Sequence, residues 1–421
     1  MKENLYSVSL FSGAMGLDIG LEQAGITTLI CNDVDADAVA TIRHNKPEIP
    51  VLDKSISNVS CEEIKALIAG GSPDIVVGGP PCQSFSVFGN RKGIQDLRGQ
   101  MVFEFFRVVD ELRPKAFIME NVRGLLSIPF VNKKDFDPET MSPDLLRPGS
   151  LIRFLLGKFN GIGYRVDCFV VNSVNYGAPQ IRERVFLIGN VYGIEAKFPQ
   201  PMFSNRPQDG LPPFRTLGDA IGKGFADPYP EVMDFSPRKL SYLSMVPPGG
   251  NWRSLPLDVQ KESMGKSWYL KGGRSAYWRK LSFDFPSPTV VTMPNHAGTS
   301  MCHPKELRAI SVGEAAAIQE FPACWAFQGS TGSKFKQIGN AVPIRLGRMA
   351  GETVIDILER AKNGEMGDEI TSKVTHIRPH VRTRAFFRNG ESFAGSTCYY
   401  QSQKAQMSLF DEEGKGESSR A

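Results

Sequence analysis

A cysteine and a glutamate each follow an apolar segment, and together they have the residue types for covalent catalysis. Cys82 lies in residues 78–84 (GGPPCQS), just after the apolar run 75–77, and Glu120 follows the apolar run 116–119. Such runs predict buried strands, and ligands of open α/β sheets bind at the carboxyl ends of strands. A thiol beside a carboxylic acid suits attack on an electron-poor ring with protonation of a ring nitrogen. The alternative is that Cys82 is a small buried apolar residue, as free cysteines commonly are.

The N-terminal segment predicts a strand, a glycine turn and a helix, an arrangement that holds nucleotide-like cofactors. Residues 8–11 form an apolar run, residues 12–16 (SGAMG) a glycine-rich turn, and residues 17–24 a helix that Gly25 ends. Glycines let a ligand approach the backbone and the helix N-terminus. The spacing differs from the dinucleotide fingerprint, so the turn alone is a weak signal.

Acidic residues end the next two predicted strands. Asp33 follows residues 28–32, and Asp53 follows residues 51–52, with Ile56 close behind. An acid at the end of the second strand is placed to bind ribose hydroxyls, and Ile56 is placed to line an adenine ring. Asp33 could instead cap the following helix, a role that is also open to Asp35. Three strand ends therefore predict one adenosine-like cofactor.

Composition sets broad limits. The chain has 421 residues, a net charge of +4 and seven cysteines, none of them paired at zinc-ligand spacing. We therefore expect no disulfide framework and no metal. The polar start and the lack of any apolar run of roughly 18 residues predict a cytoplasmic protein. A small positive charge permits a nucleic-acid partner without requiring one.

Six segments of the chain occur in an order that is specific when taken together. They are residues 11–16 (FSGAMG), 80–83 (PPCQ), 120–122 (ENV), 180–184 (QIRER), 279–281 with 286–289 (RKL and PSPT), and 337–343 (QIGNAVP). One such match arises by chance, but six in order over residues 5–362 do not. On these residues the chain resembles the bacterial type of DNA (cytosine-5) methyltransferases, which use S-adenosylmethionine.

The resemblance implies roles for individual residues. Cys82 matches the nucleophile that adds to carbon 6 of cytosine, Glu120 the acid at ring nitrogen 3, and Arg182 and Arg184 the arginines near the base. The residues matching or placed for contacts with S-adenosylmethionine are Phe11, Gly13, Gly16, Asp33, Asp53, Ile56, Pro80 and Asn340. Asp33 stands where the family commonly has the longer glutamate, and Val34 where many members have an aromatic residue, so the ribose and adenine contacts are less well matched.

The resemblance also implies base flipping, because the target carbon is inaccessible in stacked duplex DNA. Residues 87–100 are then a mobile loop that closes over the substrate, although a solvated surface loop is the alternative. The residues expected to contact DNA are Gln83, Ser84, Arg91, Arg98, Arg238, Arg253 and Arg274. An ordinary solvated face is the alternative reading for the last three. No metal is implied.

The predicted fold is α/β, with a Rossmann-like, mostly parallel sheet, helices on both faces and a smaller irregular target recognition domain. Residues 1–189 form the catalytic and cofactor-binding domain. Residues 190–336 form the small domain, with the recognition region at about 190–275, where proline and glycine are frequent. Residues 337–362 return as a helix to the first domain. Residues 363–421 are expected to be a polar, flexible tail.

The expected partner is double-stranded DNA, with a cognate restriction endonuclease if the chain belongs to a restriction-modification system. We expect a monomer associated with the bacterial nucleoid. Residues 406–410 (QMSLF) resemble the short peptides that dock into the replication sliding clamp.

Other functions remain open at this point. The same chemistry could act on tRNA, although the size of the 190–275 segment favours DNA. A non-catalytic DNA-binding regulator would not need Cys82, Glu120 and Arg184. A nicotinamide dehydrogenase would need the dinucleotide glycine pattern, which residues 11–16 lack.

Overall fold

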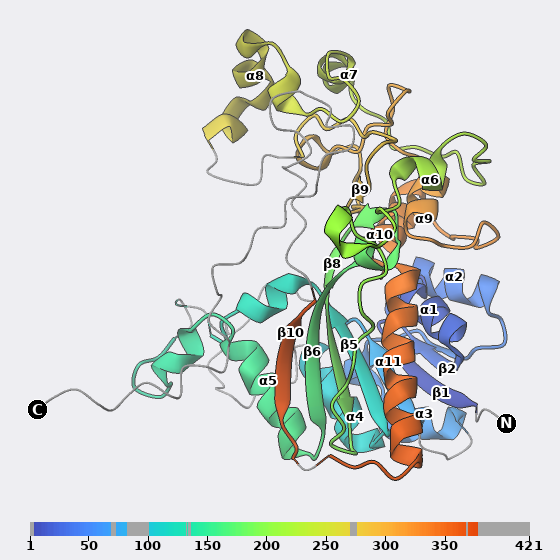
Figure 1. Ribbon diagram of the computed structural model, residues 1–421, viewed down its shortest axis with the longest axis vertical. Coiled ribbons are helices and arrows are strands. Elements are labelled where there is room, and N and C mark those ends of the chain that lie inside the picture. Colours follow the sequence, from blue (N-terminus) through green and yellow to red (C-terminus); the bar gives the residue numbers. More distant parts are fainter. Residues whose placement is uncertain are drawn as a thin grey trace, which may run out of the picture.

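The computed structural model describes residues 4–68, 73–81, 101–131, 133, 136–269, 276–367 and 369–377. A sheet of eight strands dominates this part of the chain and fills the lower half of Figure 1. Its strands are β1 (Leu5–Leu10), β2 (Ile26–Asn32), β3 (Val51–Leu52), β4 (Ile75–Gly78), β5 (Ala116–Asn121), β6 (Arg165–Asn172), β8 (Glu183–Asn190) and β10 (Ser372–His376).

The strand order is β10-β6-β8-β5-β4-β1-β2-β3. Strand β8 is antiparallel to its neighbours β5 and β6, and all the other neighbouring strands are parallel. The carboxyl ends of β1, β4 and β5 therefore meet at one edge of the sheet, which is where the sequence analysis expects the reacting groups and the cofactor. The predicted mostly parallel α/β fold is confirmed.

Helices cover both faces of the sheet, because its central strands are apolar on both sides. In β5, Phe117 and Met119 belong to the core that contains α3 (Cys61–Leu67), α4 (Met101–Leu112) and α5 (Ser150–Gly161). Ala116 and Ile118 alternate with them and belong to the core that contains α1 (Gly16–Ala24) and α11 (Ile344–Lys362). This alternation is the two-residue period of a strand. Helix α2 (Ala36–Asn45) follows β2.

Helix α11 returns to the first helix of the chain and crosses it closely (Figure 1). A Cβ atom on Gly20 would overlap the carbonyl oxygen of Ile344, and one on Gly347 would lie 2.7 Å from the carbonyl oxygen of Leu17. Glycines at both positions therefore let the two backbones touch. The predicted helix after Pro343 is confirmed by α11.

The second part of the molecule, residues 203–269 and 276–340, lies above the sheet in Figure 1 and is called the small part below. Before it, residues 191–198 run along the sheet, where Ile194 and Phe198 belong to its core. A two-stranded sheet of β7 (Gln180–Ile181) and β9 (Ser287–Pro288) joins it to the strands below. Its helices are α6 (Leu217–Ile221), α7 (Pro237–Ser244), α8 (Leu257–Met264), α9 (Val312–Ile318) and α10 (Thr331–Asn340).

Two apolar cores stabilise the small part. One surrounds α7 and α8 and contains Trp252 and Trp278. The other surrounds α6, α9 and α10 and also contains Ile19 of α1 and Ile42 of α2. The inner region of the small part therefore shares its core with α1 and α2, whereas α7 and α8 form an outer region.

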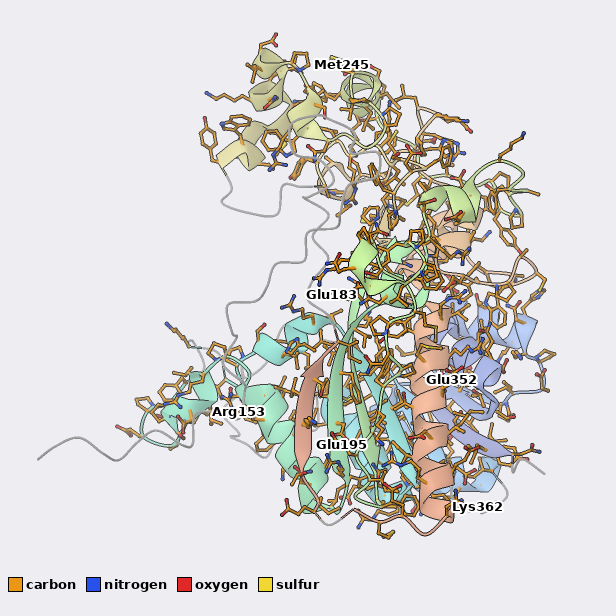
Figure 2. All side chains as sticks on the ribbon, viewed as in Figure 1. Arg153, Glu183, Glu195, Met245, Glu352 and Lys362 are labelled. Carbon is orange, nitrogen blue, oxygen red and sulfur yellow. The ribbon has the colours of Figure 1, made fainter. Side chains whose placement is uncertain are left out.

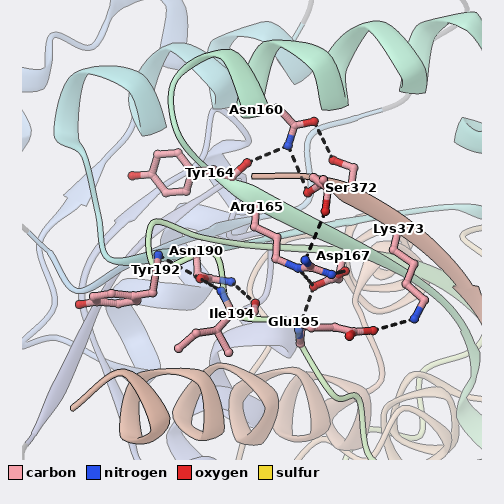
Figure 3. Close-up of polar contacts among 12 residues, drawn as sticks. Asn160, Tyr164, Arg165, Asp167, Asn190, Tyr192, Ile194, Glu195, Ser372 and Lys373 are labelled. Carbon is pink, nitrogen blue, oxygen red and sulfur yellow. Dashed lines mark hydrogen bonds and ion pairs between the residues drawn. The ribbon is translucent and has the colours of Figure 1, made fainter. Parts of the chain in front are cut away.

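The predicted flexible tail from residue 363 is wrong for residues 372–376, which form the edge strand β10 parallel to β6. Figure 3 shows the contacts around this edge: Asn160 Nδ2 donates to the carbonyl oxygen of Thr371 (3.2 Å), and Lys373 pairs with Glu195 (2.6 Å). The sequence SKVTH is mostly polar because an edge strand faces solvent, so it lacks the apolar run that predicts a buried strand.

Among the described residues, no helix combines the length and the apolar character needed to cross a lipid bilayer.

Candidate active site

The residues before Cys82 are held beside Glu120 by the pairing of two parallel strands. Gly78, the last residue of β4, lies opposite Met119 of β5. Asn121 Nδ2 then donates a hydrogen bond of 2.9 Å to the carbonyl oxygen of Pro80. A Cβ atom on Gly79 would lie 3.1 Å from Glu120 Oε2, so a glycine lets the backbone pass close to the carboxylate. The sequence predicts that this segment lies close to Glu120, and the structure shows this proximity as far as Pro80.

Six of the residues predicted to act on the base or the DNA lie outside the described residues. They are Cys82, Gln83, Ser84, Arg91, Arg98 and Arg274. Their roles stay predictions.

Glu120 and Arg184 form a buried ion pair between neighbouring antiparallel strands. Arg184 Nε lies 2.6 Å from Glu120 Oε1, and both side chains are about nine-tenths buried. This distance is that of a charge-assisted hydrogen bond, so the guanidinium group of Arg184 holds Oε1. The other oxygen, Oε2, lies on the side of Gly79 and can bind a further group.

Burial raises the pKa of Glu120, while the positive charges of Arg184 and Arg182 partly oppose the rise. A carboxylic acid with a raised pKa holds its proton at a higher pH than a free glutamate does. The environment of Glu120 therefore suits a group that delivers a proton inside a site sheltered from water.

Arg182 lies in the chain between β7 and β8, and its guanidinium group binds backbone rather than facing an open site. Nη1 donates to the carbonyl oxygen of Val290 (3.0 Å), and Nη2 donates to those of Gly339 (2.7 Å) and Ala341 (2.9 Å). Its side chain is 1% exposed. The sequence groups Arg182 with Arg184, but the structure gives the two arginines different partners.

The turn after β1 has the shape of a cofactor cradle. Phe11, Gly13 and Met15 all have positive φ angles, of 55°, 54° and 65°. Only glycine adopts such angles readily, so the other two are held by their surroundings. A Cβ atom on Gly13 would have nothing within 4 Å, so the turn is open there. The cradle fits a ligand that approaches the backbone and the start of α1.

Asp33 closes this turn from the end of β2. Its Oδ2 accepts a hydrogen bond from the backbone N–H of Gly13 (2.7 Å), and its Oδ1 accepts one from that of Asp35 (2.9 Å). Burial raises the pKa of Asp33, and these two hydrogen bonds oppose the rise. The cap of α2 is Asp35, whose side chain accepts from Asp37 and Ala38. The carboxylate of Asp33 thus shapes the turn while lying at the predicted ribose position.

The other predicted cofactor residues differ in exposure. The Asp53 side chain is 60% exposed and pairs with Arg43 (3.0 Å). Ile56 is buried among core residues, so little of its side chain is free to line a ring. Asn340 is exposed at the end of α10, and the next residues approach the cradle: a Cβ atom on Gly16 would lie 2.7 Å from the carbonyl oxygen of Val342.

Two of the predicted DNA-contacting arginines lie on the outer region of the small part. Arg238 is on α7, with its guanidinium 5.7 Å from the ring centre of Tyr242. Arg253 is 4.4 Å from the ring centre of Trp252. Both arginines are exposed. Figure 2 shows Met245, next to α7, at the far end of the molecule and Glu183, next to Arg184, at the junction with the sheet.

Sequence reasoning missed three side chains around this site. Asn121 anchors Pro80, and Arg123 Nη1 pairs with Glu183 Oε2 at 3.2 Å, which joins the segment after β5 to β8. The available signal was position, because Asn121 directly follows Glu120 and Arg123 is three residues after it. Gln319 forms buried hydrogen bonds with Gln180 and with the backbone of residues 338 and 341. Nothing in the pattern around Gln319 points to it.

Solved methyltransferases have a similar fold. A protein described as a DNA modification methyltransferase, encoded within an Escherichia coli prophage, superposes with a TM-score of 0.58 at 24% identity, covering 84% of this chain and 99% of that one. A methyltransferase of Entamoeba histolytica gives 0.56 at 16% identity, covering 85% and 99%. At these identities the likeness establishes the fold, which is that of a Rossmann-like methyltransferase.

Sequence comparison defines the family. The family model of the C-5 cytosine-specific DNA methylases matches residues 5–356. The Type II methyltransferase M.Eco47II of Escherichia coli is 37% identical over 368 residues, which are 86% of this chain and 81% of that protein. M.Sau96I of Staphylococcus aureus is 35% identical over 350 residues, covering 83% and 75%.

The chain therefore belongs to the C-5 cytosine-specific DNA methylase family. It is an enzyme that transfers a methyl group to carbon 5 of cytosine in DNA, and the family and fold imply S-adenosylmethionine as the methyl donor.

Proposed function

We propose that the chain methylates a flipped cytosine by covalent catalysis, with Cys82 as the nucleophile and Glu120 as the acid. The observation that carries this proposal is the buried Glu120 carboxyl group beside Arg184, at the end of the strand next to the one that leads to Cys82. Burial raises the pKa of Glu120, which favours a role as proton donor.

In the proposed reaction the Cys82 thiolate forms a bond to carbon 6 of cytosine. The electron pair of the 5,6 double bond shifts into the bond between carbons 4 and 5. The electron pair between carbon 4 and nitrogen 3 then takes the proton that Glu120 supplies. Arg184 holds the carboxyl group in place and lies where it can also reach the base carbonyl. S-adenosylmethionine supplies the methyl group from its positively charged sulfur. Carbon 5 takes this methyl group with the electron pair of the 4,5 double bond as the double bond between carbon 4 and nitrogen 3 re-forms, and the proton on nitrogen 3 passes back to Glu120. Carbon 5 then loses its own proton to a base, and the thiolate leaves carbon 6 as the 5,6 double bond re-forms.

For S-adenosylmethionine, we propose that the positive-φ turn formed by Phe11, Gly13 and Met15 receives the methionine portion, with Gly16 and the start of α1 below it. The shape of this turn and the open space at Gly13 support the proposal. Asp33 is proposed for the ribose, and Pro80 and Asn340 for the reacting side. Asp53 and Ile56 are weaker candidates for the adenine edge, because one is largely exposed and the other is buried in the core.

For DNA, we propose that the outer region of the small part reads the duplex and that residues 87–100 close over the flipped base. The exposed guanidinium groups of Arg238 and Arg253, each beside an aromatic ring, support the first point. Gln83, Ser84, Arg91, Arg98 and Arg274 are proposed contacts from sequence alone. Extruding a base costs a few kcal/mol, which contacts with the base in the site must offset.

The relatives named Type II methyltransferases support a place in a restriction-modification system, with a cognate nuclease recognising the same sequence. We further propose a monomeric, nucleoid-associated protein of the bacterial cytoplasm. The proposed division is a catalytic domain in residues 1–189, a recognition-bearing segment in residues 190–336 and a return to the first domain in residues 337–362. The predicted single helix over residues 337–362 is wrong, because residues 337–340 end α10 and α11 begins at Ile344.

The decisive experiment measures transfer of labelled methyl groups from S-adenosylmethionine to mixed-sequence duplex DNA, with tRNA in parallel and Cys82→Ala as a control. Label at carbon 5 of cytosine in DNA, lost in the variant, is the expected result. Label that persists in Cys82→Ala would remove covalent catalysis by this thiol. Label in tRNA alone would move the substrate to RNA.

A separate proposal concerns residues 406–410 (QMSLF), which we suggest bind the replication sliding clamp. Two apolar side chains in a polar segment suit a peptide that folds on binding. Co-purification with the clamp should be lost in the double variant Leu409→Ala and Phe410→Ala. An unchanged yield of clamp would rule the contact out.

A further inference from the structure

Three buried side chains form one hydrogen-bonded group at the junction between the sheet and the small part. This group, called the buried joint, consists of Gln180 in β7, Arg182 after β7 and Gln319 after α9; each side chain is at most 1% exposed. Gln180 Nε2 donates to Gln319 Oε1 at 2.6 Å. Gln319 and Arg182 both donate to the carbonyl oxygen of Ala341, at 3.2 Å and 2.9 Å.

The buried joint holds the backbone on both sides of Asn340. Gln319 Nε2 donates to the carbonyl oxygen of Ile338 (2.7 Å), and Arg182 Nη2 donates to that of Gly339 (2.7 Å). With the two bonds to Ala341, three of the four carbonyl groups in residues 338–341 accept hydrogen bonds from buried side chains. These carbonyls lie at the C-terminal end of α10, where no following helical turn supplies backbone N–H donors. The conformation of Asn340 is therefore imposed by side chains from distant parts of the sequence.

The same backbone presses against the cofactor cradle. A Cβ atom on Gly16 would lie 2.7 Å from the carbonyl oxygen of Val342 and 3.0 Å from Ala341 Cβ. No side chain fits at Gly16, so a shift of residues 341–342 would move the start of α1 or open a gap beside it. Whatever holds residues 338–342 therefore also fixes this wall of the cradle.

The buried joint also reaches the segment after β9 and the proposed catalytic acid Glu120. Gln180 Oε1 accepts from the backbone N–H of Val290 (3.2 Å), and Arg182 Nη1 donates to the carbonyl oxygen of the same residue (3.0 Å). The positive charge of Arg182 lowers the pKa of Glu120 from the level that burial alone would set. One side chain thus touches the small part and the cofactor wall, and acts on Glu120 through space.

Burying a guanidinium group is costly, and a neutral side chain could bind one of these carbonyls equally well. The fork of an arginine, however, binds three carbonyls from two segments at once. Its Nε has no hydrogen-bond partner among the described residues. The side chain is therefore placed to bind these three carbonyls, and not to give every guanidinium N–H an acceptor.

We propose that Arg182, with Gln180 and Gln319, is a positioning residue that fixes residues 338–342 as the wall of the cofactor site, whereas Arg184 acts at the base. The inference rests on the proposed function only in placing the cofactor at Gly16 and Asn340. It separates two arginines that the sequence motif groups together.

The test compares Arg182→Lys, Gln319→Met and Arg184→Lys for binding of S-adenosylhomocysteine by calorimetry without DNA, and for kcat and the KM of each substrate. Gln337→Met is the matched control. Gln337, in α10, is a buried glutamine like Gln319, but it forms hydrogen bonds with Thr41 and with the carbonyl oxygen of Gln328. We expect Arg182→Lys and Gln319→Met to weaken binding of S-adenosylhomocysteine and raise the KM for S-adenosylmethionine about tenfold or more. Arg184→Lys should mainly lower kcat, and Gln337→Met should bind like the wild type.

Unchanged binding of S-adenosylhomocysteine in Arg182→Lys or Gln319→Met, with a fall in kcat like that of Arg184→Lys, would overturn the proposal. Equal weakening in Gln337→Met would also overturn it, because the effect would then be general loosening of the fold. If Arg182→Lys does not fold, Gln319→Met decides. Because binding is measured without DNA, a wild-type chain that binds S-adenosylhomocysteine but methylates no DNA would refute the proposed function and leave this test intact.

Discussion

Arg184 Nε lies 2.6 Å from Glu120 Oε1, and this contact joins the neighbouring strands β8 and β5. The arginine therefore holds one carboxyl oxygen, and the other is left for the base in the proposed reaction. Glu120→Gln keeps the shape and removes the acid, so we expect kcat to fall by roughly 100- to 10,000-fold. Binding of S-adenosylhomocysteine should persist. Single-turnover methylation of duplex DNA measures the loss.

The control for this variant is Glu352→Gln, which removes a carboxylate from a surface ion pair with Arg348 on α11. Such pairs contribute little, so its kcat should match the wild type. Near-normal methylation by Glu120→Gln would show that another group protonates the ring.

Asp18 should make the stability of the protein depend on pH. Burial raises its pKa from 3.8 to about 6, and its Oδ2 has no hydrogen-bond partner among the described residues. Between these pH values the native state keeps a proton that the unfolded chain has lost. The free energy of unfolding therefore decreases as the pH rises through this window, by about 3 kcal/mol from this residue.

Asp18→Asn cannot titrate, so its free energy of unfolding should decrease less between about pH 4 and pH 7 than that of the wild type. Urea denaturation across this range measures the difference in slope. Asp53→Asn, at an exposed position, should keep most of the wild-type decrease. An identical slope in Asp18→Asn would show that the carboxyl group titrates normally in the folded chain.

The crossing of α1 and α11 predicts opposite effects for two glycine-to-alanine variants. A methyl group at Gly20 would overlap the backbone of α11, whereas one at Gly157 in α5 has nothing within 4 Å. Gly20→Ala should lower the thermal unfolding midpoint, because the helices must separate. Gly157→Ala should raise the free energy of unfolding by about 0.5–1 kcal/mol through helix propensity. Calorimetry that ranks the two variants in the reverse order would contradict the close crossing.

The edge strand β10 predicts a step in stability between two C-terminal truncations. A chain of residues 1–377 keeps β10 and should unfold at nearly the same temperature as the full-length chain. A chain of residues 1–367 loses the backbone hydrogen bonds to β6, each contributing about 1 kcal/mol, and exposes the edge of the sheet. Its midpoint should be several degrees lower. Equal midpoints for both truncations would mean that β10 does not stabilise the sheet.

The sequence predicted those parts of the fold that repeat a local pattern. The strand before Cys82 and the strand before Glu120 are buried on both faces, so continuous apolar runs predict them. Helix α4 has a continuous apolar face, which predicts a helix. The proximity of Pro80 and Glu120 followed from placing both at the ends of parallel strands.

The parts that the sequence did not predict depend on partners far along the chain. Strand β10 is polar, and only the edge of β6 makes it a strand. The three carbonyls bound by Arg182 lie 108 to 159 residues away in sequence. Ile56 closely follows a predicted strand end, and this position favours contact with an adenine ring. Its burial in the core depends on tertiary packing, which no local sequence pattern reveals.

The meeting of α1 with α11 has a consequence for biosynthesis. A ribosome makes α1 early and α11 roughly 320 residues later, so the glycine-lined face of α1 emerges without the helix that will cover it. At roughly 5–20 residues per second, this interval is on the order of half a minute. The cradle also lacks residues 338–342 during that time. A nascent chain therefore cannot assemble the proposed cofactor site before residues 338–342 have been made, so methylation should begin only after most of the chain has been synthesised.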